Sequence, residues 1–161
     1  MYSEAPEFKD NTLYRSTIGS LLYIANWTWP DIALPVNLLS RHVSNPTTYH
    51  WEAIKWVLRY LKHSSEAYLR LEPDATKQPT LTCYADADWA GDAKSRKSTS
   101  GYVFFLNSSP VHWYTGKQNL VAMSTTEAEY ICLSKAANNL TWFDDLLSSI
   151  WAEPTYPITI Y

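Results

Sequence analysis

The sequence predicts an α/β protein in which a helical N-terminal segment precedes a mixed sheet that carries one long helix. Apolar residues recur at helical spacing before Pro73, whereas apolar and polar residues alternate as in strands after it. A capping-box pattern at Ser124 then begins a long helical stripe. We therefore divide the chain into a helical segment at residues 1–72, a linker at 73–79 and a sheet segment at 80–161.

The composition is typical of a globular intracellular chain. Hydrophobic residues make up 46% of the 161 residues, but no apolar run reaches the length of about 18 residues that a membrane span needs. The net charge of −3 gives no general attraction to nucleic acid, so such binding would depend on local basic clusters. The two cysteines and four histidines lack the spacing of a zinc site or a disulfide framework. We expect no membrane association and a cytoplasmic location.

Three helices are expected in the first segment. The first follows Asn11 or Thr12 as its cap and ends at Trp29 and Pro30. The second begins at Thr28, and Pro35 is expected to kink or shorten it. Their apolar positions are Tyr14, Thr17, Ile18, Leu21, Leu22 and Ala25 in the first helix, and Ile32, Val36 and Leu39 in the second.

The third helix follows Thr47 and Thr48, which are both good N-cap residues. Its apolar stripe is expected at Trp51, Ile54, Leu58 and Leu61, with Lys55, Arg59 and Lys62 beside it. These three basic residues fit either a solvated outer face or a track for a nucleic-acid backbone, and the solvated face is the commoner arrangement.

The second segment predicts a small sheet and one long helix. A strand is expected at residues 80–86, followed by a hairpin whose strands, 101–107 and 111–115, flank a turn at 108–110. A further short strand is expected at 120–123, and a helix runs onward from the capping box at 124–127. The final residues, 156–161, alternate as a strand that a right-handed crossover would place parallel to the first.

Acidic residues gather at the end of the first predicted strand. Alternation places Asp86 and Asp88 on one face, just before a turn that contains Gly91. A calcium loop is excluded, because Ala90 and Lys97 occupy positions where such a loop needs oxygen ligands. The acids therefore either solvate a turn or hold a metal ion.

Glu129 supplies the second carboxylate of the candidate site. Its spacing from Leu133 and Ala136 predicts that it projects from the core-facing stripe of the long helix. Because an unpaired buried carboxylate is costly, Glu129 either escapes to solvent at the helix start or meets a cation. With Asp86 opposite, that cation would be Mg²⁺.

Three stretches in the second segment closely resemble the ribonuclease H region of copia-type retrotransposon Pol polyproteins. They are YADADWAGD at 84–92, RKSTSGYVFF at 96–105 and STTEAEY at 124–130. The first segment resembles the connection between reverse transcriptase and that region, through YRSTIGSLLY at 14–23, PDIA at 30–33 and HWEAIKWVLRYLK at 50–62. Trp29, where relatives usually have Arg, and Pro35 depart from the family pattern.

The resemblance implies an incomplete ribonuclease H-like sheet and a function in cleaving the RNA strand of RNA–DNA hybrids. Family enzymes use four carboxylates and two Mg²⁺ ions, and the resemblance assigns catalysis and metal binding to Asp86 and Glu129. The third carboxylate lies two residues beyond Tyr161 in the family and the fourth lies further on, so we expect a fragment that is inactive by itself. The implied partners are the hybrid, the reverse transcriptase and the downstream ribonuclease H segments. A virus-like particle or the nucleus are alternative locations for an active element.

Substrate contacts are expected just after the acidic strand end. Basic and hydroxyl side chains suited to phosphate and 2′-OH contacts follow one another at Arg96, Lys97, Ser98, Thr99 and Ser100. A solvated loop would have the same composition. The rival function is a non-catalytic remnant that binds nucleic acid or a partner protein.

Overall fold

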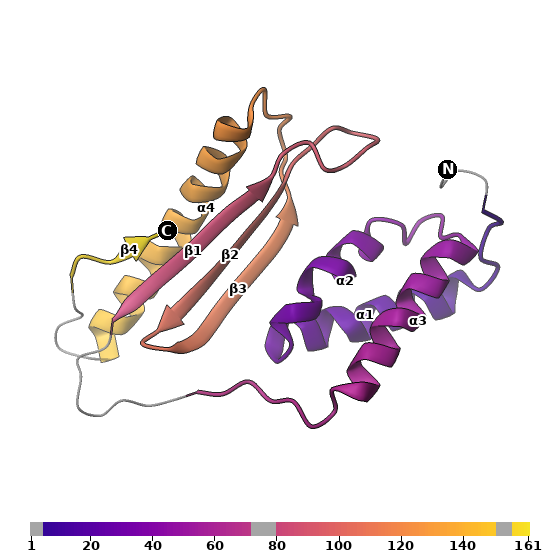
Figure 1. Cartoon of the computed structure of the whole chain (residues 1–161), viewed down its shortest axis with the longest axis horizontal. Helices are drawn as coiled ribbons and strands as arrows, with labels where there is room; N and C mark the ends of the chain where they lie inside the picture. Colours follow the sequence, from indigo (N-terminus) through magenta and orange to yellow (C-terminus); the bar gives the residue numbers. More distant parts are fainter. Residues whose placement is uncertain (1–4, 72–79, 151–155) are drawn as a thin grey trace. The chain divides into compact units, whose positions relative to one another are not determined.

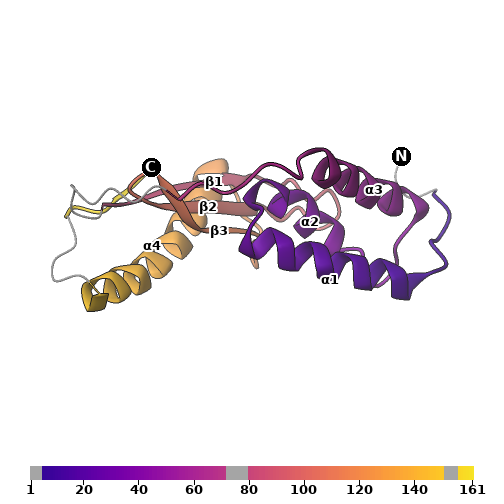
Figure 2. The same ribbon diagram turned by 90° about the horizontal axis from the view of Figure 1, so that it is seen from below.

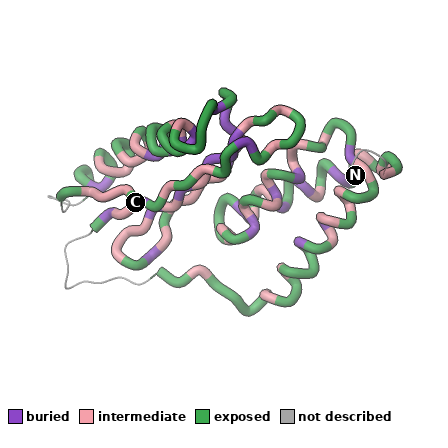
Figure 3. The backbone as a smooth tube through the Cα atoms, turned by 45° about the horizontal axis from the view of Figure 1, so that its top comes forward, coloured by how far each residue is buried: buried purple, intermediate pink, exposed green. Residues whose placement is uncertain are grey.

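The structure is a computed structural model of the 161-residue chain, and it describes residues 5–71, 80–150 and 156–161 (Figure 1). The chain forms two compact units, Met1–Leu69 and Arg70–Tyr161, and each has its own hydrophobic core. Figure 3 shows the buried residues of both cores in purple. The linker expected at 73–79 lies outside the described residues.

Helix α1 of the first unit spans Asn11–Trp27. Its N-cap is Asp10 rather than Asn11 or Thr12, because the Asp10 carboxylate accepts a hydrogen bond from the Leu13 N–H at 2.9 Å. The predicted apolar face is confirmed, with Tyr14, Ile18, Leu21 and Ala25 buried. The Tyr14 hydroxyl also donates to the backbone oxygen of Leu39 at 2.9 Å, which ties α1 to the next helix.

The second predicted helix starts later than expected. A 3₁₀ turn at Pro30–Ile32 leads into α2 at Ala33–Ser40. Pro35 therefore lies in the first turn of α2, where a backbone N–H has no intrahelical partner and its loss costs nothing. Of the two effects expected of Pro35, a kink or a shortened helix, the structure shows the shortened helix, and the buried face at Ile32, Val36 and Leu39 is confirmed.

Helix α3 spans Thr48–His63 and begins with a capping box. Thr47 is the N-cap, and its backbone N–H donates to Nδ1 of His50 at 3.0 Å. Ile54 and Val57 are the buried residues, while Leu58, expected on the core side, is 41% exposed. The other predicted positions are confirmed, because Ile54 is buried and Trp51 and Leu61 pack against the core, while Val57 takes the place expected for Leu58.

The second unit contains a four-stranded sheet of order β3-β2-β1-β4. The strands are β1 at Leu81–Asp88, β2 at Thr99–Leu106, β3 at Ser109–Lys117 and β4 at Thr159–Ile160. The first three pair antiparallel, and β4 pairs parallel to β1 as predicted. The hairpin turn is shorter than expected. Pro110 lies within β3 opposite Phe105, at an irregularity in the pairing, and Asn107 takes a positive φ of 55° in the turn.

Helix α4 spans Thr125–Ile150 and packs along one face of the sheet (Figures 1 and 2). Its predicted start is confirmed, because the Ser124 hydroxyl accepts from the Glu127 N–H at 3.1 Å. The short strand expected at 120–123 is wrong, since no strand forms there and Leu120, Val121 and Met123 are exposed. No helix in the described part of the chain is both long and apolar enough to cross a membrane.

Candidate functional site

Strand β1 presents different residues on its two faces. Leu81 and Cys83 are buried in the core that α4 covers, and Ala85 and Ala87 pack against the same core. Asp86 and Asp88 therefore lie on the opposite, open face, where both side chains are exposed. Their predicted common face is confirmed.

Helix α4 touches β1 at the residue that carries the first candidate carboxylate. The Cys132 thiol lies 3.0 Å from the backbone oxygen of Asp86 and 3.4 Å from that of Gly101, so it donates to the end of β1 and its neighbour β2. Glu129 precedes Cys132 by three residues, which places it about one turn closer to the start of α4. Figure 1 shows α4 starting at the end of the sheet at which β1 finishes. Asp86 and Glu129 thus belong to the same end of the second unit.

The expected orientation of Glu129 is wrong. The buried residues of α4 are Ala128, Cys132, Ala136 and Leu147, and Glu129 is exposed one position round the helix from Ala128. Because water solvates this carboxylate, it does not need a buried cation, and the burial argument for a metal pair no longer holds. Among the described residues, no group of three or more His, Cys, Asp or Glu side chains is arranged to hold a metal ion.

The donor chemistry of the two residues nevertheless fits Mg²⁺. This ion prefers oxygen ligands and is commonly held by one or two carboxylates, with water and substrate phosphates filling its other positions. Asp86 and Glu129 are exposed carboxylates at one end of the sheet, but Asp86 lies on the face opposite the one that α4 covers. Asp86 also accepts a hydrogen bond on Oδ1 from the Ala87 N–H at 2.8 Å, which orients its side chain.

The Asp92 side chain is held by hydrogen bonds within the loop that follows β1. Its Oδ1 accepts from the N–H and the hydroxyl of Ser95, both at 2.8 Å, and its Oδ2 lies 2.7 Å from Nζ of Lys117. The hydrogen bond from Lys117, followed by that from the Ser95 backbone, holds the pKa of Asp92 well below its usual range. Asp92 therefore braces the loop after β1 and is occupied by partners of its own.

Three of the expected substrate contacts are contradicted by burial. Ser98, Thr99 and Ser100 are 0%, 7% and 2% exposed. The Ser98 hydroxyl accepts from the Ala90 N–H at 3.1 Å, and the Ser100 hydroxyl accepts from Gln118 at 2.9 Å. These side chains stabilise the start of β2 and do not reach a ligand surface.

The two basic residues of that stretch lie at the surface. Arg96 is exposed and has a positive φ of 56°, within the loop that Asp92 braces. Lys97 is half-buried, and its ammonium donates to the backbone oxygen of Asn119 at 2.7 Å. Arg96 is therefore the better placed of the two for contact with a phosphate.

Comparison with known proteins places the sequence in a family. No protein-family model matches the chain, and no solved structure matches it. The Pol polyprotein of transposon RE2 from Arabidopsis thaliana is 40% identical over 152 residues, and that of transposon TNT 1-94 from Nicotiana tabacum is 41% identical over 137 residues. These alignments cover 94% and 85% of this chain. The chain belongs to the copia-type retrotransposon Pol polyproteins.

This Pol segment spans 10% of the length of each of those two polyproteins. It is also similar to a much shorter protein, the secreted RxLR effector protein 161 of Plasmopara viticola. The two are 46% identical over 132 residues, which are 82% of this chain and 92% of that protein. The family resemblance predicted from the sequence motifs is confirmed.

Gln118 is a residue of the Pol segment that sequence reasoning missed. It is 6% exposed, and its amide nitrogen donates to the hydroxyl of Ser100 and to the backbone oxygen of Ala128, both at 2.9 Å. It thus connects the end of β3 and the start of β2 to the first turn of α4, beside Glu129. No local pattern marks a glutamine for such a role, because its partners come from distant parts of the chain.

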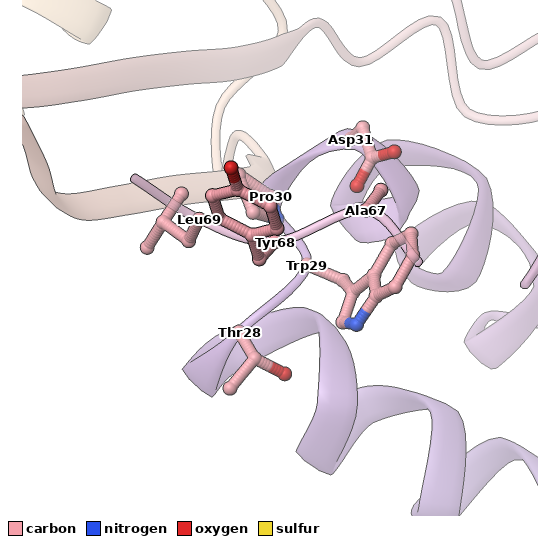
Figure 4. Close-up of a pocket in the computed structure, with 7 residues that line it drawn as sticks. All are labelled: Thr28, Trp29, Pro30, Asp31, Ala67, Tyr68 and Leu69. Atoms are coloured by element: carbon pink, nitrogen blue, oxygen red, sulfur yellow. The ribbon is translucent and has the colours of Figure 1, made fainter. Parts of the chain in front are cut away.

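The first unit of the Pol segment contains a pocket of about 550 Å³ that the sequence did not predict (Figure 4). It lies where the turn between α1 and the 3₁₀ helix meets the extended chain after α3. Its lining residues are Thr28, Trp29, Pro30, Asp31, Ala67, Tyr68 and Leu69.

Proposed function

We propose that this Pol segment forms the first part of a ribonuclease H that cleaves the RNA strand of RNA–DNA hybrids. In this proposal Asp86 and Glu129 are two of the Mg²⁺ ligands. The contact between the Cys132 thiol and the Asp86 backbone is the observation that carries it, because this contact fastens the helix of Glu129 to the strand end of Asp86. Bound Mg²⁺ would activate a water molecule for attack on the phosphodiester.

The pairing of β4 with β1 supports a ribonuclease H-like arrangement. Thr159 and Ile160 pair with Thr82 and Cys83, and Tyr161 continues the ladder by donating to Cys83 and accepting from Ala85 at 2.8 and 2.9 Å. In this register each residue of β4 lies beside the residue of β1 numbered 77 lower (159 − 82 and 160 − 83). The position two residues beyond Tyr161, where the family has its third carboxylate, therefore aligns with Asp86.

Each residue of this site has a separate role in the proposal. Asp86 and Glu129 supply carboxylate oxygens and leave the remaining metal positions to water and phosphate. Arg96, with Lys97 beside it, contacts the phosphate backbone of the hybrid. Asp92 and Lys117 keep the intervening loop in place.

Cleavage of a labelled RNA–DNA hybrid by the Pol protein that contains this segment tests the proposal. We expect Asp86→Asn and Glu129→Gln each to reduce Mg²⁺-dependent cleavage about a hundredfold, because each removes a metal ligand, and even outer-shell partners of a metal site cost about 10–100-fold when they are lost. Asp145→Asn, a change at an exposed carboxylate further along α4, serves as the matched control and should leave cleavage unchanged. Full activity in Asp86→Asn would overturn the assignment.

A second candidate is a non-catalytic protein that binds nucleic acid or a protein partner. The observation that favours it is the relative from Plasmopara viticola, of which this segment covers nearly the whole length. Measuring the binding of the RNA–DNA hybrid to the 161-residue chain distinguishes the two functions. Binding of the hybrid that needs no Mg²⁺ and is unaffected by Asp86→Asn would favour the non-catalytic function, whereas Mg²⁺-dependent binding that is lost in Asp86→Asn would favour the metal site.

A further inference from the structure

The pocket of the first unit has the chemical character of a cation site. Two of its lining residues, Trp29 and Tyr68, carry aromatic rings, and a third, Asp31, carries a carboxylate. None of its lining residues is basic. Figure 4 shows the Trp29 indole, the Tyr68 ring and the Asp31 carboxylate around the same space. Aromatic faces and a carboxylate both attract positive charge.

Tyr60, which is not one of the lining residues, holds the Asp31 carboxylate in place. Its hydroxyl donates to Oδ2 of Asp31, and this hydrogen bond is the main reason that the pKa of Tyr60 is raised. The Tyr60 ring meets the Trp29 indole edge-on, with 6.3 Å between centroids and an interplanar angle of 84°. Trp29, Tyr60 and Asp31 thus form one connected wall. Within the described part of the chain, no Lys, Arg or His pairs with Asp31, so its charge is not neutralised from inside.

We propose that this pocket binds an arginine side chain from a peptide segment of a partner protein. A guanidinium group is planar, so it stacks on an aromatic ring and at the same time donates two hydrogen bonds to a carboxylate. The volume of about 550 Å³ accommodates one arginine with its flanking backbone. Nucleotides and other anions are disfavoured, since Asp31 repels them and no basic lining residue compensates. This site lies in the first unit and needs no metal, so it is independent of the proposed ribonuclease function.

The test is an NMR titration of the 161-residue chain with the peptide Gly-Arg-Gly, blocked at both ends. The peptide Gly-citrulline-Gly is the matched probe, because citrulline keeps the shape of arginine without its charge. We expect the indole N–H signal of Trp29 to shift on addition of the arginine peptide, with an affinity at least about tenfold higher than for the citrulline peptide. Equal affinities would overturn the proposal, as would tighter binding of AMP.

Two variants locate the binding. Asp31→Asn should weaken arginine binding about tenfold or more, because it removes the charge. Tyr68→Ala should weaken it as well, and it leaves the fold intact because Tyr68 is 82% exposed. Asp145→Asn is the control that should change nothing. Unchanged binding in Tyr68→Ala, with a native spectrum, would contradict the proposed site even if Asp31→Asn failed to fold.

Discussion

The thiol of Cys132 and the backbone oxygen of Asp86 lie 3.0 Å apart, and this contact fixes helix α4 against the end of strand β1. Cys132 is 1% exposed, so a larger side chain here would have to displace its buried neighbours. Its position one turn after Glu129 means that any displacement of α4 here also displaces the second candidate ligand.

Enlarging the side chain at this contact should disturb the packing of the second unit. Cys132→Leu is expected to destabilise the second unit by about 1–3 kcal/mol, because overpacking forces the helix and strand apart. Urea unfolding followed by circular dichroism measures this loss. Leu133→Met, at a residue 39% exposed, is the control and should change stability by less than about 0.5 kcal/mol. Equal stabilities of the two variants would show that the contact is loose.

Removing the Gln118 side chain should also destabilise the second unit. Gln118→Ala deletes two buried hydrogen bonds and leaves the Ala128 carbonyl without this donor. The expected cost is about 1–3 kcal/mol in the free energy of unfolding. Asn119→Ala is the neighbouring control, since Asn119 is exposed and, among the residues that the structure describes, its bond to Lys97 is made by its backbone oxygen and not by its side chain. A cost below that of the control would contradict the connecting role of Gln118.

Because of the Asp92–Lys117 pair, we expect the free energy of unfolding of the second unit to depend on pH in the acidic range. Asp92 has a pKa lowered in the folded state, so its contribution is present above the unfolded value of about 3.9 and is lost as the pH falls below it. Asp92→Asn should therefore destabilise the second unit at pH 7 and cost progressively less as the pH falls below about 4. Urea unfolding at several pH values measures the difference. A pH-independent difference between variant and parent would contradict the pairing.

The environment of His50 predicts that the stability of the first unit also depends on pH. Burial, with the nearby His42 as a smaller cause, lowers the pKa of His50, and the two rings stack with centroids 3.8 Å apart. Folding therefore favours neutral His50, so stability is constant above about pH 6.5 and falls as the pH drops below it. Protonation of Nδ1 would also remove the acceptor of the Thr47 N–H. Amide exchange in the first turn of α3 should accelerate accordingly below pH 6.5.

The matched variant for this effect is His50→Gln. Glutamine at the same position of a capping box accepts the same bond but does not titrate near neutral pH. Amide exchange in this variant, corrected for the intrinsic pH dependence, should be flat between pH 5 and pH 7. A remaining acceleration at low pH would assign the effect to another group.

Sequence reasoning succeeded where local chemistry decides the structure. The start of α4 follows from the Ser124 hydroxyl capping Glu127, and the parallel pairing of Thr159 and Ile160 follows from crossover geometry. Alternation also placed Asp86 and Asp88 on one face. Each of these features depends on a few neighbouring residues or on a general rule of topology.

The failures arose where distant residues meet. Ser98 and Ser100 looked like surface hydroxyls, but Ala90 and Gln118 bond to them in the interior. The spacing of Glu129 from Leu133 predicts a buried Glu129, but Leu133 is 39% exposed, and Ala128 and Cys132 define the buried face of α4. The pocket at Trp29 and Tyr68 joins two stretches separated by α2 and α3, so no local pattern could reveal it.

Manganese titration of the Pol protein that contains this segment tests the central claim most directly, since Mn²⁺ replaces Mg²⁺ at oxygen sites and broadens nearby NMR signals. The account predicts that the backbone amides of Asp86 and Glu129 broaden together at the same Mn²⁺ concentration. Asp86→Asn should weaken both effects. Broadening at only one of the two residues, or at Asp144 and Asp145 instead, would contradict the assignment of Asp86 and Glu129 to one metal site.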